Sequence, residues 1–146
     1  MTALSEAKCR LRRAENQIRS ESFTVAPSTT IYQGALVAFI TNSTTVTNAT
    51  SAANRSAAIG VAKNTVVQTA SSTYKVEVEY GHEELFTISA NITVASIGKT
   101  VGATDNDSLD TITSLASNQC RVGKVVSVPS STTAWIAVGV AGFADT

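Results

Sequence analysis

The feature that most limits the fold of this chain is a long succession of short apolar runs that begins at Phe23. Segments of Ser, Thr, Asn, Gly and Pro separate these runs, at intervals typical of a β-sandwich or barrel. In the clearest run, 73–80, Tyr and Val occupy the even positions and Lys and Glu follow them at odd ones. Such a period of two places one face against a core and the other in water. The sequence therefore predicts an all-β domain, a small β-barrel or β-sandwich.

Other runs predict further strands in the same way, and turn residues lie between them. The expected strands are 23–26, 35–41, 57–62, 84–88, 100–103, 121–128 and 133–140, with a weak edge strand at 45–47. Pro27-Ser28, Gln33-Gly34 and 105–107 carry residues that preset φ, tolerate positive φ or bond their own backbone. The segment 93–97 is expected to form one helical turn that ends at Gly98.

The first 22 residues differ from the rest, because they are rich in Arg, Glu, Gln and Ala and contain no Gly, Pro or aromatic residue. Apolar residues recur there at steps of three and four, which indicates a helical stripe: Leu4, Ala7, Leu11, Ala14 and Ile18. A helix this short is marginal in water on its own, since about 12–15 residues are needed. We therefore predict a partly helical basic arm, 1–22, that packs on its own domain or on a partner, followed by a β-domain, 23–146.

Charge is unevenly distributed along the chain, although the net charge is zero. Residues 1–21 hold five basic side chains against three acidic ones, whereas 76–110 hold seven acidic residues and a single lysine. Such segments favour contact between unlike surfaces of neighbouring subunits, but a solvated surface is the preferred interpretation. Taken as a whole, the chain therefore lacks the strongly positive field that sequence-independent nucleic-acid binding needs. No apolar run approaches the roughly 20 residues of a membrane span, and the charged start disfavours a signal peptide.

Residue types that carry catalysis are sparse. His82 is the only histidine, lies in an expected hairpin turn and has no G-x-S-x-G motif to work with, so a surface-turn histidine is expected. The acidic run 105–110 lacks the Gly and Glu of a calcium-binding EF-hand loop, which favours an acidic turn. Cys9 and Cys120 are expected to be isolated thiols. Trp135 is either a sugar-stacking platform or, preferably, a core anchor. We predict no enzyme, no cofactor and no metal.

Read in order, the β-region resembles the small head-decoration, or cement, proteins of tailed bacteriophages. The resemblance spans residues 31–138, and its specificity lies in the order and spacing of short pieces. These pieces are Ile31-Tyr32-Gln33-Gly34-Ala35-Leu36-Val37, Ile59-Gly60-Val61-Ala62, Val76-Glu77-Val78, Ile97-Gly98-Lys99-Thr100-Val101, Asp105-Asn106-Asp107, Val122-Gly123-Lys124-Val125-Val126 and Trp135-Ile136-Ala137-Val138. The basic arm with its arginines is similar to the N-terminal stretch of those proteins.

This resemblance implies a structural virion protein, made in the host cytoplasm, that binds the outside of a phage head. It implies a homotrimer that reinforces contacts between major capsid subunits, with neither nucleic acid nor membrane as partner. We assign an apolar arm contact with the shell to Leu4, Leu11 and Ile18. Contacts with acidic shell or subunit surfaces are assigned to Arg10, Arg12, Arg13 and Arg19. The alternative is a carbohydrate- or receptor-binding β-module of a virion surface or fibre protein.

Overall fold

The computed structural model describes residues 3–14, 18–114 and 120–139. These residues form thirteen strands and two short 3-10 turns, η2 (Val94–Ser96) and η3 (Ile112–Ser114). The strands are β1 (Arg12–Arg13), β2 (Arg19–Thr24), β3 (Thr30–Ile31), β4 (Leu36–Ile40), β5 (Val46–Asn48), β6 (Arg55–Ala62), β7 (Val66–Val67), β8 (Lys75–Tyr80), β9 (Glu83–Ile88), β10 (Thr100–Ala103), β11 (Ser108–Thr111), β12 (Arg121–Ser127) and β13 (Thr133–Val138). The fold is all-β, which confirms the expectation from the two-residue period.

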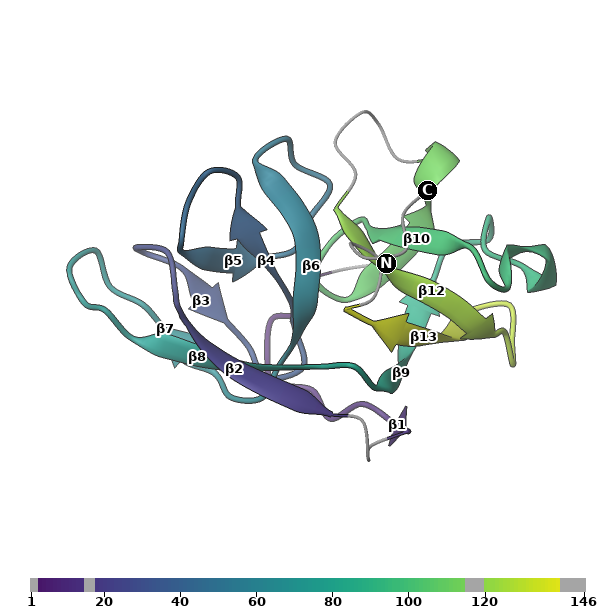
Figure 1. Cartoon of the computed structure of the whole chain (residues 1–146), viewed down its shortest axis with the longest axis horizontal. Coiled ribbons are helices and arrows are strands. Elements are labelled where there is room, and N and C mark those ends of the chain that lie inside the picture. Colours follow the sequence, from purple (N-terminus) through teal and green to yellow (C-terminus); the bar gives the residue numbers. More distant parts are fainter. Residues whose placement is uncertain (1–2, 15–17, 115–119, 140–146) are drawn as a thin grey trace.

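Five strands close into a small barrel, on the right in Figure 1. Around the ring they follow the order β9, β11, β10, β12, β13, and β13 pairs again with β9. The β9–β11 pair is parallel and the other four are antiparallel. Buried side chains such as Phe86, Leu109, Val122 and Ile136 form its core. Closure pairs both edges of this sheet, so that few strand edges are left open to other chains.

A second sheet, on the left in Figure 1, has the order β2, β8, β6, β4, β5 and is strongly curled. Its two edges meet at one point, because Val25 just after β2 forms a parallel bridge with Val46 of β5. The short pair β3–β7 lies beside it. Ile31, Val37 and Val76 belong to the apolar cluster that this curled sheet encloses.

Strand β4 lies between the two cores and joins them. Leu36 and Ala38 belong to the barrel cluster, whereas Val37 between them belongs to the curled-sheet cluster, and all three are fully buried. A strand that is buried on both faces is apolar at successive positions rather than at alternate ones. The run Leu-Val-Ala-Phe-Ile of β4 has this character. The barrel and the curled sheet, residues 18–139 as described, are called the body below.

The expected helical arm is wrong. Residues 3–14, called the strap below, contain no helix, and β1 within them pairs antiparallel with Glu83 and Glu84 of β9. The expected boundary between residues 22 and 23 lies inside β2. The extended form prevails because a short isolated helix is marginal in stability. In an extended strap, charged residues that are two positions apart in the sequence all face the body.

Several local predictions are confirmed. The strand expected at 100–103 has those bounds, and the weak edge strand expected at 45–47 is β5, which lies at a sheet edge. The helical turn expected at 93–97 is η2, capped by the Thr93 side chain and followed by Gly98 at φ +84°. The short strands β1, β3, β7 and β11 were not expected. Across 3–14, 18–114 and 120–139, no helix is long and apolar enough to cross a membrane.

Candidate functional site

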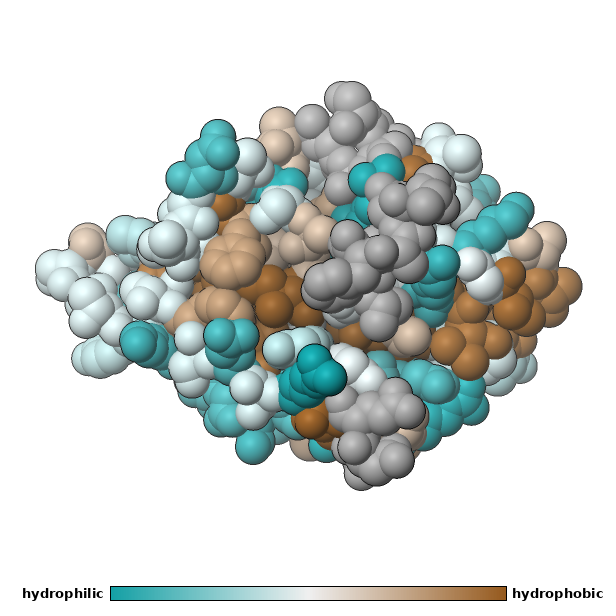
Figure 2. Space-filling view, viewed as in Figure 1, coloured by the Kyte–Doolittle hydropathy of each residue, from teal (hydrophilic) through white to brown (hydrophobic). Residues whose placement is uncertain are grey.

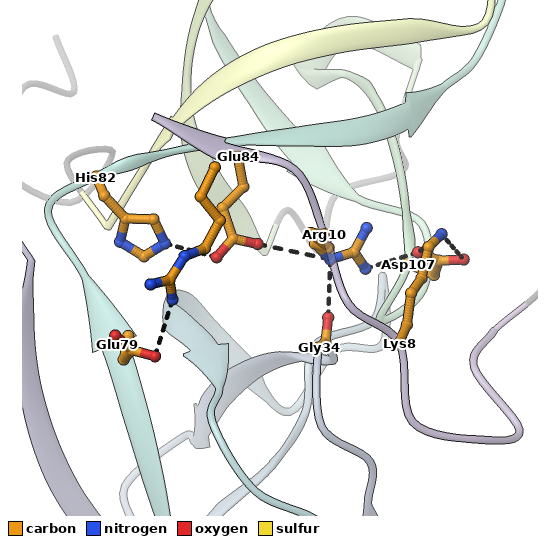
Figure 3. A network of polar contacts seen from close by, with 8 residues as sticks. Lys8, Arg10, Gly34, Glu79, His82, Glu84 and Asp107 are labelled. Carbon is orange, nitrogen blue, oxygen red and sulfur yellow. Dashed lines mark hydrogen bonds and ion pairs between the residues drawn. The ribbon is translucent and has the colours of Figure 1, made fainter. Parts of the chain in front are cut away.

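Arg10 is the centre of a buried charge network that joins the strap to the body (Figure 3). Its side chain is only 1% exposed. The guanidinium Nη2 lies 2.6 Å from Asp107 Oδ1, and Nε donates to the Gly34 carbonyl oxygen at 2.9 Å. Nε also lies 3.7 Å from Glu84 Oε2, and the guanidinium carbon lies 4.3 Å from the centre of the Phe86 ring. A buried charge is tolerated only with such partners, so the body provides a built site for this arginine.

Glu84 connects Arg10 to the single histidine. His82 Nε2 lies 2.6 Å from Glu84 Oε1, and both side chains are almost completely buried. His82 lies in the turn between β8 and β9, as expected, but the expected exposure is wrong, because its ring points inward to Glu84. Within the described residues, Arg10 Nη1, Glu84 Oε2 and His82 Nδ1 have no hydrogen-bond partner. Arg10, Glu84 and His82 are thus closed to solvent but not saturated with hydrogen bonds.

Two further strap cations flank Arg10. Lys8 Nζ lies 3.0 Å from Asp107 Oδ1, so that this carboxylate binds two cations. Arg12 Nη1 lies 3.0 Å from Glu79 Oε1. Because Lys8, Arg10 and Arg12 are two residues apart, an extended backbone directs all three towards the body. Cys9 and Leu11 between them are exposed, Leu11 by 65%.

Arg13 closes the strap at its C-terminal end. Its Nε lies 2.6 Å from Glu83 Oε1, and Nη2 donates to Ser127 Oγ at 3.1 Å. The guanidinium carbon lies 4.2 Å from the centre of the Trp135 ring, a cation–π contact. Trp135 is therefore half-buried with Arg13 over its ring, rather than being a core anchor.

Backbone contacts hold the strap along its length. Lys8 N donates to the Gln33 carbonyl oxygen at 2.8 Å, and Leu85 N donates to the Leu11 carbonyl oxygen at 3.1 Å. Near the start, Leu4 N donates to Asn106 Oδ1 at 2.8 Å. The body residues that hold the strap, called the socket below, are Gln33, Gly34, Glu79, Glu83, Glu84, Leu85, Phe86, Asn106, Asp107, Ser127 and Trp135.

Gly34 makes the close approach of the strap possible. It has φ +89°, a region that favours glycine. A Cβ atom placed there would overlap the carbonyl oxygen of Lys8. Any larger residue would therefore displace the strap backbone at Lys8. A cavity of about 160 Å³ lies beside this point and is lined by strap residues, including Cys9, and by body residues, including Lys63.

The seven residues predicted to bind the capsid have different surroundings. Arg10 is enclosed by its own chain, while Arg12 and Arg13 pair with body carboxylates and are partly exposed. Leu4 packs on the curled-sheet cluster, Leu11 is exposed, and Ile18 is half-buried. Arg19 is exposed in β2, opposite Tyr80 of β8. The structure brings Arg10, Arg12 and Arg13 together on the socket. Their contact with a capsid stays a prediction.

Sequence reasoning missed the socket, although one signal was present. The basic arm and the acidic segment 76–110 do contact each other, but within this chain, through Glu79, Glu83, Glu84 and Asp107. The two-residue spacing of Lys8, Arg10 and Arg12 would have indicated an extended strap. The helical spacing of the apolar residues competed with that signal.

The two cysteines differ as reactive groups. Cys9 is exposed on the strap, whereas Cys120 is buried in the barrel cluster and donates from Sγ to the Ser56 carbonyl oxygen at 3.0 Å. Burial raises the pKa of the Cys120 thiol to about 12, and nearby Arg55 only partly opposes this shift. Cys9 alone is therefore positioned for thiol chemistry at neutral pH.

The site as a whole is suited to holding a basic extended segment. Four strap cations lie against four body carboxylates, and Arg10 and Glu84 at the centre are shielded from water. Within the part of the chain that the structure describes, no three His, Cys, Asp or Glu side chains gather to hold a metal ion. A scan against protein-family models finds no match to this chain, and a search of curated proteins finds no related sequence.

Proposed function

We propose that this chain is a structural virion protein that binds the outer surface of a phage capsid, as a homotrimer, and stabilises contacts between major capsid subunits. The proposal starts from the resemblance of residues 31–138 to head-decoration proteins. It is supported by the kind of surface that the all-β body exposes.

The observation that carries the proposal is the position of the exposed apolar side chains. Val94 is 71% exposed in η2, and Ile97 beside it is also exposed. Figure 2 shows this apolar area at the right-hand end of the molecule, and a hollow of about 340 Å³ adjoins it. Val67 in β7 is 62% exposed, and Tyr74, exposed as well, is hydrogen-bonded to Gln68, the residue after Val67. In Figure 1, β7 and η2 lie at opposite ends of the long axis.

Exposed apolar side chains at two separate places, around Val94 and at Val67, suit a protein that bridges two neighbours. Each end is small, so that each contact is weak by itself. Simultaneous contact at both ends raises the effective concentration of the second contact and makes the total affinity much higher. A shell of identical subunits provides many equivalent pairs of sites for such a bridge.

The strap network adds stiffness to this bridge. The network connects the barrel, through Glu84, with the curled sheet, through Gly34 and Glu79. A strap fastened across both parts limits their relative movement. A stiff bridge loses less conformational entropy on binding than a flexible one does.

Co-sedimentation with phage heads that lack this protein tests the proposal. We expect saturable binding at a fixed number of copies per capsid unit. Val94→Asp and Val67→Asp change one end each, and each should lower the apparent affinity by more than tenfold. Thr44→Asp, an exposed change between β4 and β5, is the matched control and should bind as the parent does. Absence of saturable binding, or equal binding of all variants, would refute the proposal.

The alternative, a carbohydrate- or receptor-binding module, has a distinct outcome in the same experiments. A stacking platform needs a free aromatic face, whereas Arg13 lies over the Trp135 ring. Glycan binding by the whole chain that is lost in Trp135→Ala, with the fold retained, would favour the alternative. Capsid binding that survives Trp135→Ala would favour the cement role.

A further inference from the structure

The strap and the socket are complementary through chemistry, not through nearness in the chain. Leu4 bonds to a residue 102 positions away, and Arg10 to residues 24 and 97 positions away. Arg13 bonds to residues 70 and 114 positions away. Every copy of the chain carries the same strap and the same socket, so a strap from a second copy can make all these contacts without loss.

An empty socket lacks the cations that its carboxylates pair with, so it offers a site for the strap of any copy. Without a strap, Glu84 and Asp107 lose the strap cations that lie against them, and Glu79 and Glu83 lose theirs as well. The socket then presents four carboxylates without the strap cations that they pair with. The socket is therefore a binding site for a basic extended segment, and the only question is which copy supplies it.

Backbone strain lies where the strap ends. Residues 14–18 join β1 to β2, and Ala14, the first of them, has φ +57°. This left-handed conformation is unfavourable for any residue with a Cβ atom. A strap that extends to a neighbouring copy is free to relax this residue, whereas a strap that returns to its own body keeps it. Short connections under strain favour exchange of an element between copies.

We propose that the socket is an interface between copies: where copies lie side by side, the strap of one occupies the socket of the next. This inference deepens the proposed function, because it rests on a dense array of copies such as a capsid surface provides. At low concentration the strap binds its own body, since a short tether gives it an effective concentration of about 1 mM. Neighbours on an array reach comparable local concentrations, and exchange then links them.

A thiol trap with purified full-length chains tests the exchange without capsids, so that its failure leaves capsid binding untouched. One chain keeps Cys9 on the strap. The second chain carries Cys9→Ser and Lys63→Cys; the two thiol positions line the same cavity. The chains are unfolded, mixed at about 1 mM each, refolded together and treated with a short bismaleimide. Buried Cys120 stays unreactive. We expect a covalent heterodimer.

Three controls make the result decisive. A single chain that carries both Cys9 and Lys63→Cys gives the cross-linking yield that is expected when the socket holds a strap. Arg10→Ala in the strap chain should lower the heterodimer yield at least fivefold, because the strap then lacks its anchor. Val67→Cys in place of Lys63→Cys reports random collision, since Val67 is exposed on β7, outside the socket.

Ala14→Gly tests the part that strain plays. Glycine adopts positive φ without penalty, so the form in which the strap binds its own body becomes more stable. The heterodimer yield should then fall roughly fivefold to thirtyfold. Native mass spectrometry of the untreated mixture counts mixed oligomers independently of the thiols. A heterodimer yield no higher than that of the Val67→Cys control, or unchanged by Arg10→Ala, would overturn the proposal.

Discussion

Replacing Arg10 by methionine removes the cation at the centre of the strap network but keeps an unbranched side chain of similar length. Loss of one partner of a buried ion pair costs about 3–5 kcal/mol, because the remaining charge stays desolvated. Asp107 keeps Lys8 at 3.0 Å, and Arg10 lies 3.7 Å from Glu84, beyond hydrogen-bond distance. We therefore expect a loss near the lower limit, about 3 kcal/mol of unfolding free energy.

The matched control is Arg13→Met, at the end of the same strap. Arg13 is 43% exposed and its partner Glu83 is also accessible to solvent. An ion pair of this kind contributes about 0–1 kcal/mol. Both variants remove one arginine from the strap and one cation from the chain. The difference of about 2 kcal/mol between them therefore isolates the effect of burial.

Urea unfolding with two probes measures these losses. Far-ultraviolet circular dichroism follows the β-body in both variants, and the fluorescence of Trp135, the single tryptophan, follows the strap wherever Arg13 is kept over its ring. Adding Glu84→Gln to Arg10→Met should recover more than 1 kcal/mol relative to additivity, since the carboxylate charge that Arg10 no longer faces is then removed. Equal losses for Arg10→Met and Arg13→Met, or an additive double-mutant cycle, would refute the reasoning.

Three further outcomes are expected. Gly34→Ala should destabilise the chain by about 1–2 kcal/mol from positive φ alone, and it should change Trp135 fluorescence more than Ser43→Ala does. An unchanged midpoint of urea unfolding would contradict the close approach of Gly34 to the Lys8 carbonyl oxygen. A thiol reagent at neutral pH should label Cys9 rapidly and Cys120 only on unfolding; two equally fast thiols would contradict the burial. The raised pKa of Cys120, about 12 against 9.0, means that only the unfolded state loses the proton between these values. Stability is therefore lost as pH rises, and between pH 8 and 10.5 the parent should lose about 2 kcal/mol more than Cys120→Ala in urea titrations.

Local signals in the sequence were sufficient for most strands. The alternation of 74–80 predicts β8, and the apolar runs at 100–103 and 121–128 predict β10 and β12. Turn residues such as Gly98 mark where elements end. These predictions succeed because side-chain period and φ preference act over a few residues.

The candidate site was predictable only in part. The sequence shows a basic arm and an acidic segment, and the structure brings them together within one chain. The burial of His82 has no local signal, because it depends on Glu84 and on the strap that covers both. Closure of the barrel likewise depends on the pairing of β13 with β9, strands separated by 44 residues of chain.

By itself, the sequence determined the all-β class, the positions of most strands and the presence of a distinct basic segment at the start. The tertiary structure alone decided the form of that segment. Its apolar spacing permits a helix, and its charged spacing permits an extended strap. The choice depends on Asp107, Glu84 and the Gly34 carbonyl, which the fold gathers around Arg10 from distant parts of the chain. Burial of a charge needs partners on several sides at once, and only a completed fold supplies them.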